Sequence, residues 1–315
     1  MFETYQKYLQ PELPLVPGAR YAHILVLRTT ESYAVFKTDG ELNVARVQRG
    51  LTSPDLVSRV VLFKRKQTTP ERLTGRELLR RYGIYEQIGK TCEYNSGPCG
   101  ICPDCVIYGY AVGDSGSEKS KVYIDSAYSL TPYETSHETM TLNAPYEDGT
   151  MTKGTATTTR FSEQDHVLPG VYFPSVVTVR DPTALTLAYV LANIVRTKRY
   201  GAQTTRTGAV QNQILAVIFA DGEIFSNLRL TQKSADLLSG QPPYPSSEVA
   251  AAVLKAAEEL IKSDGVVYQF LREGELADLL AQAVPSEEAG VRGVLEALSA
   301  EALAYAGRTG VIKAK

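Results

Sequence analysis

The stretch VYFPSVVTVRDPTALTLAYVLANIVRTK, residues 171–198, decides the fold class. Its first part, Val171–Val179, is rich in β-branched residues and predicts a strand. Asp181 and Pro182 then suit the N-cap and the first turn of a helix. We therefore expect a helix from Thr183 to about Lys198. Its apolar residues recur at helical spacing, at Leu185, Ala188, Tyr189, Ala192 and Val195.

Further elements are expected on both sides of this unit. Asp39-Gly40 predicts a tight turn that joins Tyr33–Thr38 to Glu41–Val47 in a hairpin. Thr74 and Glu77 form a capping box, which predicts that a helix starts there. Apolar runs predict strands at Tyr21–Arg28, Leu56–Phe63, Val122–Ile124 and Gln213–Ala220. After the break at Pro242–Pro245, amphipathic patterns predict helices at Ser247–Lys262, Val267–Ala281 and Glu288–Ala306.

This order of elements mixes strand–helix–strand units with antiparallel hairpins. It predicts an α+β fold with a ferredoxin-like or RNA-recognition-motif-like core sheet and inserted segments. We expect residues 1–240 to hold the sheet and residues 241–315 to form a helical part packed on it. The apolar residues of 135–170 show little helical or strand periodicity. An irregular segment of this length inside a compact domain is normally functional. Glu147–Thr150 is the expected hairpin tip within it.

The composition is that of a folded protein. Of the 315 residues, 43% are apolar and 22% are charged, which excludes wholesale disorder. No apolar run reaches the roughly 18 residues of a membrane span. Met1–Gln10 is too polar for a signal peptide, so we expect a cytoplasmic protein with no membrane partner. The formal charge of -2 argues, on average, against nucleic-acid binding.

The charge is, however, unevenly distributed along the chain. Residues 46–81 hold ten basic and three acidic residues, a local balance of +7. Residues 245–305 hold four basic and eleven acidic residues, a balance of -7. Such segregation predicts a polyanion-binding surface on one part of the protein. The alternative for each basic run is a solvated helix face.

All four cysteines of the chain, Cys92, Cys99, Cys102 and Cys105, lie in one short segment. Intervening glycines and prolines allow a tight fold-back, so that four thiolates can surround one ion. Structural Zn²⁺ is therefore the expected cofactor. An iron–sulfur cluster is the main alternative, although the proline that follows the last ligand in ferredoxins is absent after Cys105. Free or redox-active thiols are another, and His137 or His166 could replace Cys92 as a ligand.

The segment RTKRYGAQTTRTG, residues 196–208, combines cations, hydroxyls and glycines where a helix ends before a strand. Backbone N–H groups, Thr hydroxyls and Arg side chains suit contacts with phosphates that do not read bases. Tyr200 either stacks on a base, as aromatics of single-strand binders do, or packs against the helix end. The candidate RNA-binding residues here are Arg196, Lys198, Arg199, Tyr200 and Arg206.

Four motifs, together with the cysteine segment, resemble a known family. The motifs are ETMTLNAP at 138–145, LPGVYFP at 168–174, RYGAQTTRTG at 199–208 and EIFSNL at 223–228. Over almost its whole length the chain resembles the backbone, guide-RNA-binding subunit of type I-D CRISPR Cascade surveillance complexes.

The resemblance implies an RNA-recognition-like palm with two insertions, a zinc-binding region at 85–130 and a thumb hairpin at 135–170. It also implies non-catalytic, sequence-independent binding of CRISPR guide RNA by several stacked copies. Guide bases then stay free to pair with a target strand. The implied partners are the guide RNA, the target strand, further copies of the chain and other Cascade subunits.

The candidate RNA contacts extend beyond residues 196–208. Lys153 and Arg160 lie on the expected thumb. Four more residues are candidate contacts in an RNA-binding groove, because they lie in expected strands or Gly/Ser-rich loops. They are Arg28, Lys37, Lys119 and Lys121. The Gly-rich phosphate loop found near the start of many related subunits is not obvious here.

Two other functions are compatible with these residues. In one, the backbone subunit also cleaves single strands, with Asp39, Asp148 or Asp165 as base or metal ligand. The chain has only three histidines, which gives little support to acid–base catalysis by a pair of histidines. In the other, the chain is a zinc-stabilised protein-interaction module whose basic surface meets an acidic partner. Steep salt dependence of RNA binding would favour the scaffold over the interaction module.

Overall fold

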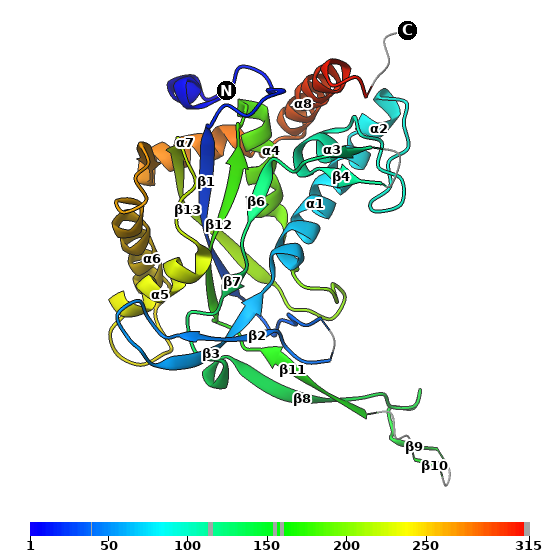
Figure 1. Ribbon diagram of the computed structural model, residues 1–315. Helices are drawn as coiled ribbons and strands as arrows, with labels where there is room; N and C mark the ends of the chain where they lie inside the picture. The colour runs from blue at the N-terminus through cyan, green and yellow to red at the C-terminus, as the bar shows by residue number, and fades with distance from the viewer. Residues whose placement is uncertain (39, 113–115, 154–155, 158–160, 312–315) are drawn as a thin grey trace.

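The computed structural model describes residues 1–38, 40–112, 116–153, 156–157 and 161–311. A twisted β-sheet forms the body, and a long hairpin extends from its lower end (Figure 1). The cysteine segment lies beside the C-terminal end of α1 (Lys64–Arg81). Two candidate residues, Asp39 and Arg160, fall outside the described residues.

The central sheet has five antiparallel strands in the order β14-β13-β1-β12-β6. β1 lies between β12 and β13, which are joined by α4 (Ala184–Arg196). The predicted strands at 21–28, 122–124, 171–179 and 213–220 are all confirmed, as is the helix between the last two. The strand bounds are β1 Tyr21–Thr30, β6 Val122–Ile124, β12 Tyr172–Arg180, β13 Val210–Ala220 and β14 Tyr268–Leu271.

Helices cover both faces of this sheet. Ala22, Ile24 and Val26 of β1 face a core built with α1, α4, α7 (Glu273–Ala283) and α8 (Glu288–Arg308). Leu25 and Leu27 face a second core with α5 (Asn227–Leu237) and α6 (Ser246–Ile261). The alternation follows from the two-residue period of a strand. Figure 1 shows α5 and α6 on one side of the sheet and α1 and α4 on the other.

A second layer lies below the central sheet. It consists of the sheet β2-β3-β7 and the hairpin β8–β11, which share an apolar core around Phe36 and Phe173. The predicted hairpin about Asp39-Gly40 is reduced to one bridge between Lys37 and Leu42, because β2 pairs with β3 instead. The bounds are β2 Val44–Gln48, β3 Leu56–Leu62, β7 Ala127–Tyr128, β8 His137–Asn143 and β11 Phe161–Val167.

Short elements complete the chain. The cysteine segment leads into α3 and is flanked by α2 before it and by the ribbon β4–β5 after it. The hairpin β8–β11 carries β9–β10 at its outer end. The bounds are η1 Glu3–Tyr8, α2 Ile84–Gln87, α3 Pro103–Tyr108, β4 Tyr110–Ala111, β5 Ser117–Glu118, η3 Tyr133–Thr135, β9 Thr152–Lys153 and β10 Ala156–Thr157. The predicted tip at Glu147–Thr150 is a turn, but the chain continues beyond it into β9 and β10.

Several predicted helix bounds were wrong. α1 starts at Lys64, and Thr74 lies inside it with its hydroxyl bonded to that of Thr197 instead of capping. α4 is capped by Thr183, because Asp181 accepts the N–H groups of Gly18 and Arg20.

The C-terminal part also differs from the expectation. The single helix predicted at Val267–Ala281 is split into β14 and α7, since residues 268–271 complete the edge of the sheet. α5 was not predicted, whereas α6 and α8 were. Within the described part of the chain, no helix has both the length and the apolar character of a membrane span.

Candidate nucleic-acid interface and metal centre

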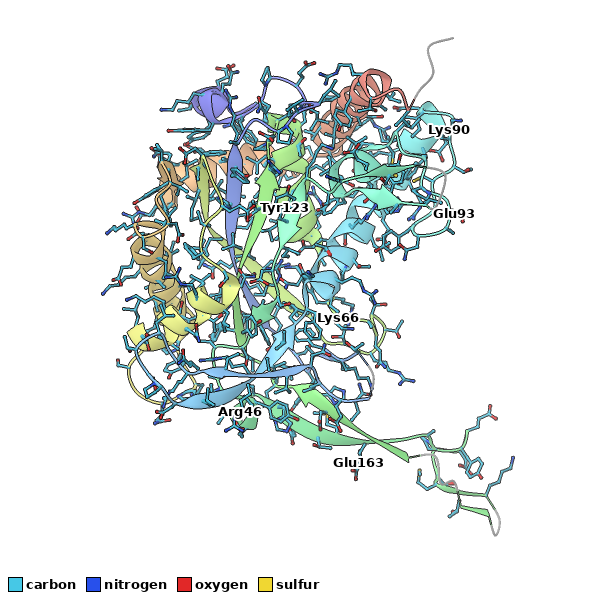
Figure 2. The ribbon with its side chains drawn as sticks, viewed as in Figure 1. Arg46, Lys66, Lys90, Glu93, Tyr123 and Glu163 are labelled. Carbon is cyan, nitrogen blue, oxygen red and sulfur yellow. The ribbon has the colours of Figure 1, made fainter. Side chains whose placement is uncertain are left out.

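Three segments that are distant in the sequence meet beside the start of α1. The loop between α4 and β13, residues 197–209, is bonded to α1 through Gly201 N–H and the Lys66 carbonyl (3.5 Å). The same loop contacts the base of the β8–β11 hairpin, where Gln164 Nε2 donates to Gln203 Oε1 at 3.4 Å. Figure 2 shows Lys66 on this side of the molecule, between Tyr123 above and Glu163 on the hairpin below. The sequence-predicted phosphate loop therefore lies between α1 and the predicted thumb.

Pro70, inside α1, provides the docking point for this loop. A proline has no N–H for the carbonyl four residues earlier, which here belongs to Lys66. The N–H of Gly201 points at that carbonyl. Gly201 has a φ of +96°, and a Cβ there would lie 2.4 Å from the Val35 carbonyl oxygen. Only glycine fits this position.

Arg28 of β1 and Tyr200 of the loop, both predicted to contact RNA, are fully buried. Arg28 Nη2 donates to Glu71 Oε1 at 2.6 Å, and the Tyr200 hydroxyl donates to the same oxygen at 2.8 Å. Burial, reinforced by the Glu71 charge, raises the pKa of Tyr200 well above its usual value. Burial disfavours the Arg28 cation, but Glu71 outweighs it and the pKa of Arg28 is raised. These side chains tie β1, α1 and the loop together and offer no surface to RNA.

Other predicted residues are exposed. Lys198, Arg199 and Arg206 are exposed on the loop, and Arg199 also donates to the Thr207 carbonyl. Lys119 and Lys153 are exposed elsewhere, and Lys37 is half-buried. The loop therefore gathers three of the predicted cations next to the start of α1.

Two predicted residues point inward. Lys121 donates to the Val106 carbonyl and to Glu118, and burial lowers its pKa despite that carboxylate. Arg196 donates to the Pro285 carbonyl, and burial lowers its pKa as well. Both residues hold neighbouring segments together rather than extending from the surface.

The basic region at 46–81 is only partly a surface. Arg59 and Arg76 are buried, and Arg72 is bound to Asp104 together with Arg76. Sequence reasoning counted Arg72 and Arg76 as available because the acid that pairs with them, Asp104, lies outside the region. The exposed members are Arg46, Arg49, Lys64, Arg65, Arg80 and Arg81.

A groove of about 490 Å³ runs along the exposed side of α1. Its lining joins cations and hydroxyls of α1 to tyrosines of β6 and the cysteine segment, and it contains no acidic residue. Arg72 lies over the Tyr94 ring at 5.0 Å. Tyr108 is buried, whereas Tyr94 and Tyr123 are half-buried and keep part of their rings at the surface. Cations beside partly exposed aromatic rings suit the backbone and bases of a single strand. The principal lining residues are Lys64, Arg65, Thr68, Tyr94, Tyr108 and Tyr123.

The β8–β11 hairpin lies where the resemblance places a thumb (Figure 1). Between His137 and Val167 the sequence has five acidic and two basic residues. This composition does not suit a phosphate clamp, because like charges repel.

The four cysteines converge, as their spacing predicts. Their Sγ atoms all lie within 4.8 Å of one another, with Cys92 at 3.8 Å from Cys102 and 3.6 Å from Cys105. Four sulfurs about 2.3 Å from one tetrahedral ion would have a similar separation. Backbone N–H groups of Cys99, Cys102 and Cys105 each donate to a preceding sulfur, which favours thiolates. The residues present therefore fit a bound metal ion.

Residues of α1 support this centre from outside. Arg76 donates to the Cys92 sulfur at 3.4 Å and to the Cys92 carbonyl at 2.7 Å. Asp104, fully buried between two ligand cysteines in sequence, accepts from Arg76 at 2.7 Å and from Arg72 at 2.8 Å. Such outer contacts orient ligands and balance their charge. Sequence reasoning missed this role, although Asp104 within the cysteine segment was an available signal.

The remaining candidates are not brought to this centre. His137 is bonded to the Tyr133 carbonyl and His166 to the Gln164 carbonyl, both at the base of the hairpin. Asp165 accepts from the hydroxyls of Tyr133 and Thr139, and Asp148 accepts from Thr150. Among the described residues, three or more side chains able to bind a metal come together only at the cysteines.

Comparison with known sequences gives one family. The model of a protein family described as "Csc2 Crispr" matches residues 8–292. No curated protein sequence matches the chain.

Solved structures with a similar fold are numerous. The crystal structure of Csc2 from Thermofilum pendens has a TM-score of 0.63 at 18% identity, covering 97% of this chain and 96% of that one. A chain of a CRISPR RNA-guided surveillance complex before nicking has a TM-score of 0.54 at 10% identity, covering 90% and 100%. A further surveillance-complex chain has a TM-score of 0.50 at 14% identity, covering 89% and 99%. At these identities the similarity establishes the mixed α+β fold.

Proposed function

The chain belongs to the Csc2 CRISPR family, and we propose that it binds guide RNA as the backbone subunit of a type I-D Cascade complex. The observation that carries this proposal is the basic surface beside the start of α1. There, Lys64 and Arg65 adjoin the loop that exposes Arg199 and Arg206. Cations and Thr hydroxyls contact phosphates, which are the same at every nucleotide. They therefore suit RNA binding that does not depend on the base sequence.

The proposed palm has an RNA-recognition-motif-like core. The strand order β13-β1-β12-β6 supports it, since α1 precedes β6 and α4 joins β12 to β13. An ordinary RNA-recognition motif stacks bases on an open sheet face. Here α5 and α6 bury that face, so we place the guide along α1 and the 197–209 loop instead.

We propose that the cysteine centre binds structural Zn²⁺. Four sulfur donors close a tetrahedral coordination sphere, which leaves no position for a reacting water. Bound zinc would hold a segment that has little apolar core of its own. By fixing Tyr94 and Tyr108, that segment completes one wall of the groove along α1.

We further propose that the subunit is a scaffold and not a nuclease. Support comes from Asp148 and Asp165, whose carboxylates are engaged by neighbouring hydroxyls rather than gathered around a common point. Several copies would stack along one guide, together with other Cascade subunits, and the guide would pair with the target strand. Incubating the complex with complementary single strands and Mg²⁺ tests this point, and cuts at a regular interval would contradict it.

Binding of single-stranded RNA tests the proposed function directly. Fluorescence anisotropy with several unrelated single strands should give nearly equal affinities that fall steeply as salt rises. A duplex of matched length should bind more weakly. Protein purified from its native host should carry small RNAs that share a repeat-derived end. Preference for a duplex, or RNA-free protein with no affinity for single strands, would overturn the proposal.

A further inference from the structure

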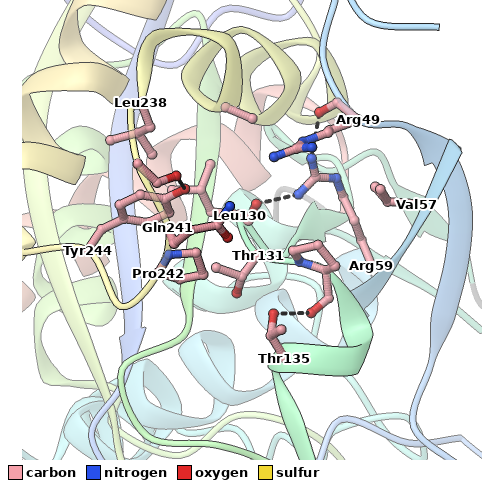
Figure 3. A pocket seen from close by; sticks show the side chains of 13 residues that line it. Arg49, Val57, Arg59, Leu130, Thr131, Thr135, Leu238, Gln241, Pro242 and Tyr244 are labelled. Carbon is pink, nitrogen blue, oxygen red and sulfur yellow. Dashed lines mark hydrogen bonds between the residues drawn. The ribbon is translucent and has the colours of Figure 1, made fainter. Parts of the chain in front are cut away.

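A second cavity lies on the other side of the lower layer, away from the 197–209 loop. It has a volume of about 260 Å³ and is lined by Arg49 just after β2, by β3, and by residues from 130–135 and 235–244 (Figure 3). Two arginines line one side, and Leu238, Pro242 and Tyr244 line the other. None of the lining residues is acidic.

Arg59 is a buried cation without a carboxylate partner. Its side chain is 1% exposed and donates to the carbonyl oxygens of Ser129 (2.7 Å), Leu130 and Arg49 (2.6 Å). Its Nε has no hydrogen-bond partner among the described residues. Burial, and then the charge of Arg49, lower its pKa to about 10. A buried charge of this kind normally has a counter-ion.

Arg49 adds a second positive charge at the same cavity. Its side chain is exposed and forms no ion pair with any described residue. Asp236, near this corner, accepts the backbone N–H groups of Leu51 (2.9 Å) and Thr52 (3.2 Å). The cavity therefore has two guanidinium groups and no anion in its lining.

The charge and shape of the cavity define a ligand class. A phosphate monoester has a charge close to -2 at neutral pH, whereas a diester or a carboxylate has a charge of about -1. Guanidinium pairs bind such oxygens well. The cavity is close to the lower limit of about 300 Å³ for small-molecule sites. Its apolar wall and the Tyr244 ring provide a surface against which a base can pack.

We propose that this cavity binds the phosphate monoester of a nucleotide, with the phosphate at Arg49 and Arg59 and the base against Tyr244. The ligand is either a free mononucleotide or the terminal nucleotide of a strand, since both present the same group. The site goes beyond the proposed guide-binding surface and does not share its residues.

Calorimetric titration of the full-length protein with AMP, UMP, adenosine and inorganic phosphate tests the proposal. AMP and UMP should bind at least tenfold more tightly than adenosine. Arg49→Ala should lose at least tenfold in AMP affinity. Arg46→Ala, on strand β2 just before Arg49 but outside the cavity, should bind normally. Tyr244→Ala should weaken AMP more than inorganic phosphate. Arg59 is left intact because it holds three backbone carbonyls.

Two tetranucleotides, with and without a 5′-phosphate, identify the source of the group. Binding that needs the 5′-phosphate and Arg49 assigns the site to a strand terminus, and binding of mononucleotides alone assigns it to free nucleotide. The proposal is overturned if AMP and adenosine bind equally, if Arg49→Ala has no effect, or if only acidic peptides bind. Arg206→Ala should impair single-stranded RNA binding but not AMP binding, which separates the two proposals.

Discussion

The Arg28 guanidinium donates to the Glu71 carboxylate at 2.6 Å, and both side chains are completely buried. The pair connects the central strand β1 to the middle of α1. Tyr200 completes it from the 197–209 loop, so the exposed loop is built on a buried ionic network. The basic surface and the core therefore depend on the same helix.

Replacement of Glu71 should therefore destabilise the whole fold. Glu71→Gln leaves the Arg28 cation buried without a counter-charge, which typically costs about 3–5 kcal/mol. Urea unfolding should show this loss, whereas Glu77→Gln, on the exposed side of the same helix, should be near neutral. The double variant Arg28→Met/Glu71→Leu should be more stable than either of its single variants. Additive losses would contradict the pairing.

Burial of Arg28 could have been predicted from the strand pattern. Ala22, Ile24 and Val26 alternate onto one face of β1, and Arg28 continues that face. Charge alone suggested a surface residue, because the sequence does not show that Glu71 lies opposite. The cysteine centre was predictable because its ligands are local. The covered sheet face was not, since it depends on where α5 and α6 pack.

Gly201 should tolerate no side chain. Its φ of +96°, and the 2.4 Å that would separate an added Cβ from the Val35 carbonyl oxygen, make Gly201→Ala destabilising by about 2 kcal/mol or more. Gly293→Ala is the matched control, because no atom lies within 4 Å of its Cβ position and alanine favours the helix α8. In the Gly201→Ala variant, the backbone amides of the 197–209 loop should exchange hydrogen faster than in the unaltered protein. Equal stability of the two variants would contradict the close approach.

Charge removal at the proposed RNA surface should change the salt dependence. For a single strand, removing one cation that neutralises a phosphate lowers the slope of log affinity against log salt by about 0.7. Arg65→Ala and Arg206→Ala should each show this change and weaken binding by up to about tenfold. Lys255→Ala, exposed on α6 across the sheet, should bind as the unaltered protein does. If Lys255→Ala had the same effect, binding would reflect overall charge only.

Removal of one ligand should release the proposed zinc. Cys102→Ser removes one of the four sulfurs that lie within 4.8 Å of one another. The zinc content found by metal analysis should therefore fall from one zinc per chain to nearly none. Limited proteolysis should then cut between residues 90 and 110. Ser96→Ala, in the same segment, should keep the metal. Iron with visible absorbance in the unaltered protein would contradict zinc and favour a cluster.

His23 should make the protein sensitive to mild acid. Burial lowers its pKa to about 4, with its ring between the Thr178 hydroxyl (2.8 Å) and the Gly222 carbonyl (3.0 Å). The unfolded chain takes up the proton near pH 6.5 and the folded chain only near 4, so stability falls as the pH drops through this window. The full effect is about 3 kcal/mol. Urea unfolding at several pH values should show that the free energy of unfolding falls less steeply with acid for His23→Gln. If the unfolding free energies of both proteins fall in parallel as the pH drops, His23 is not the cause.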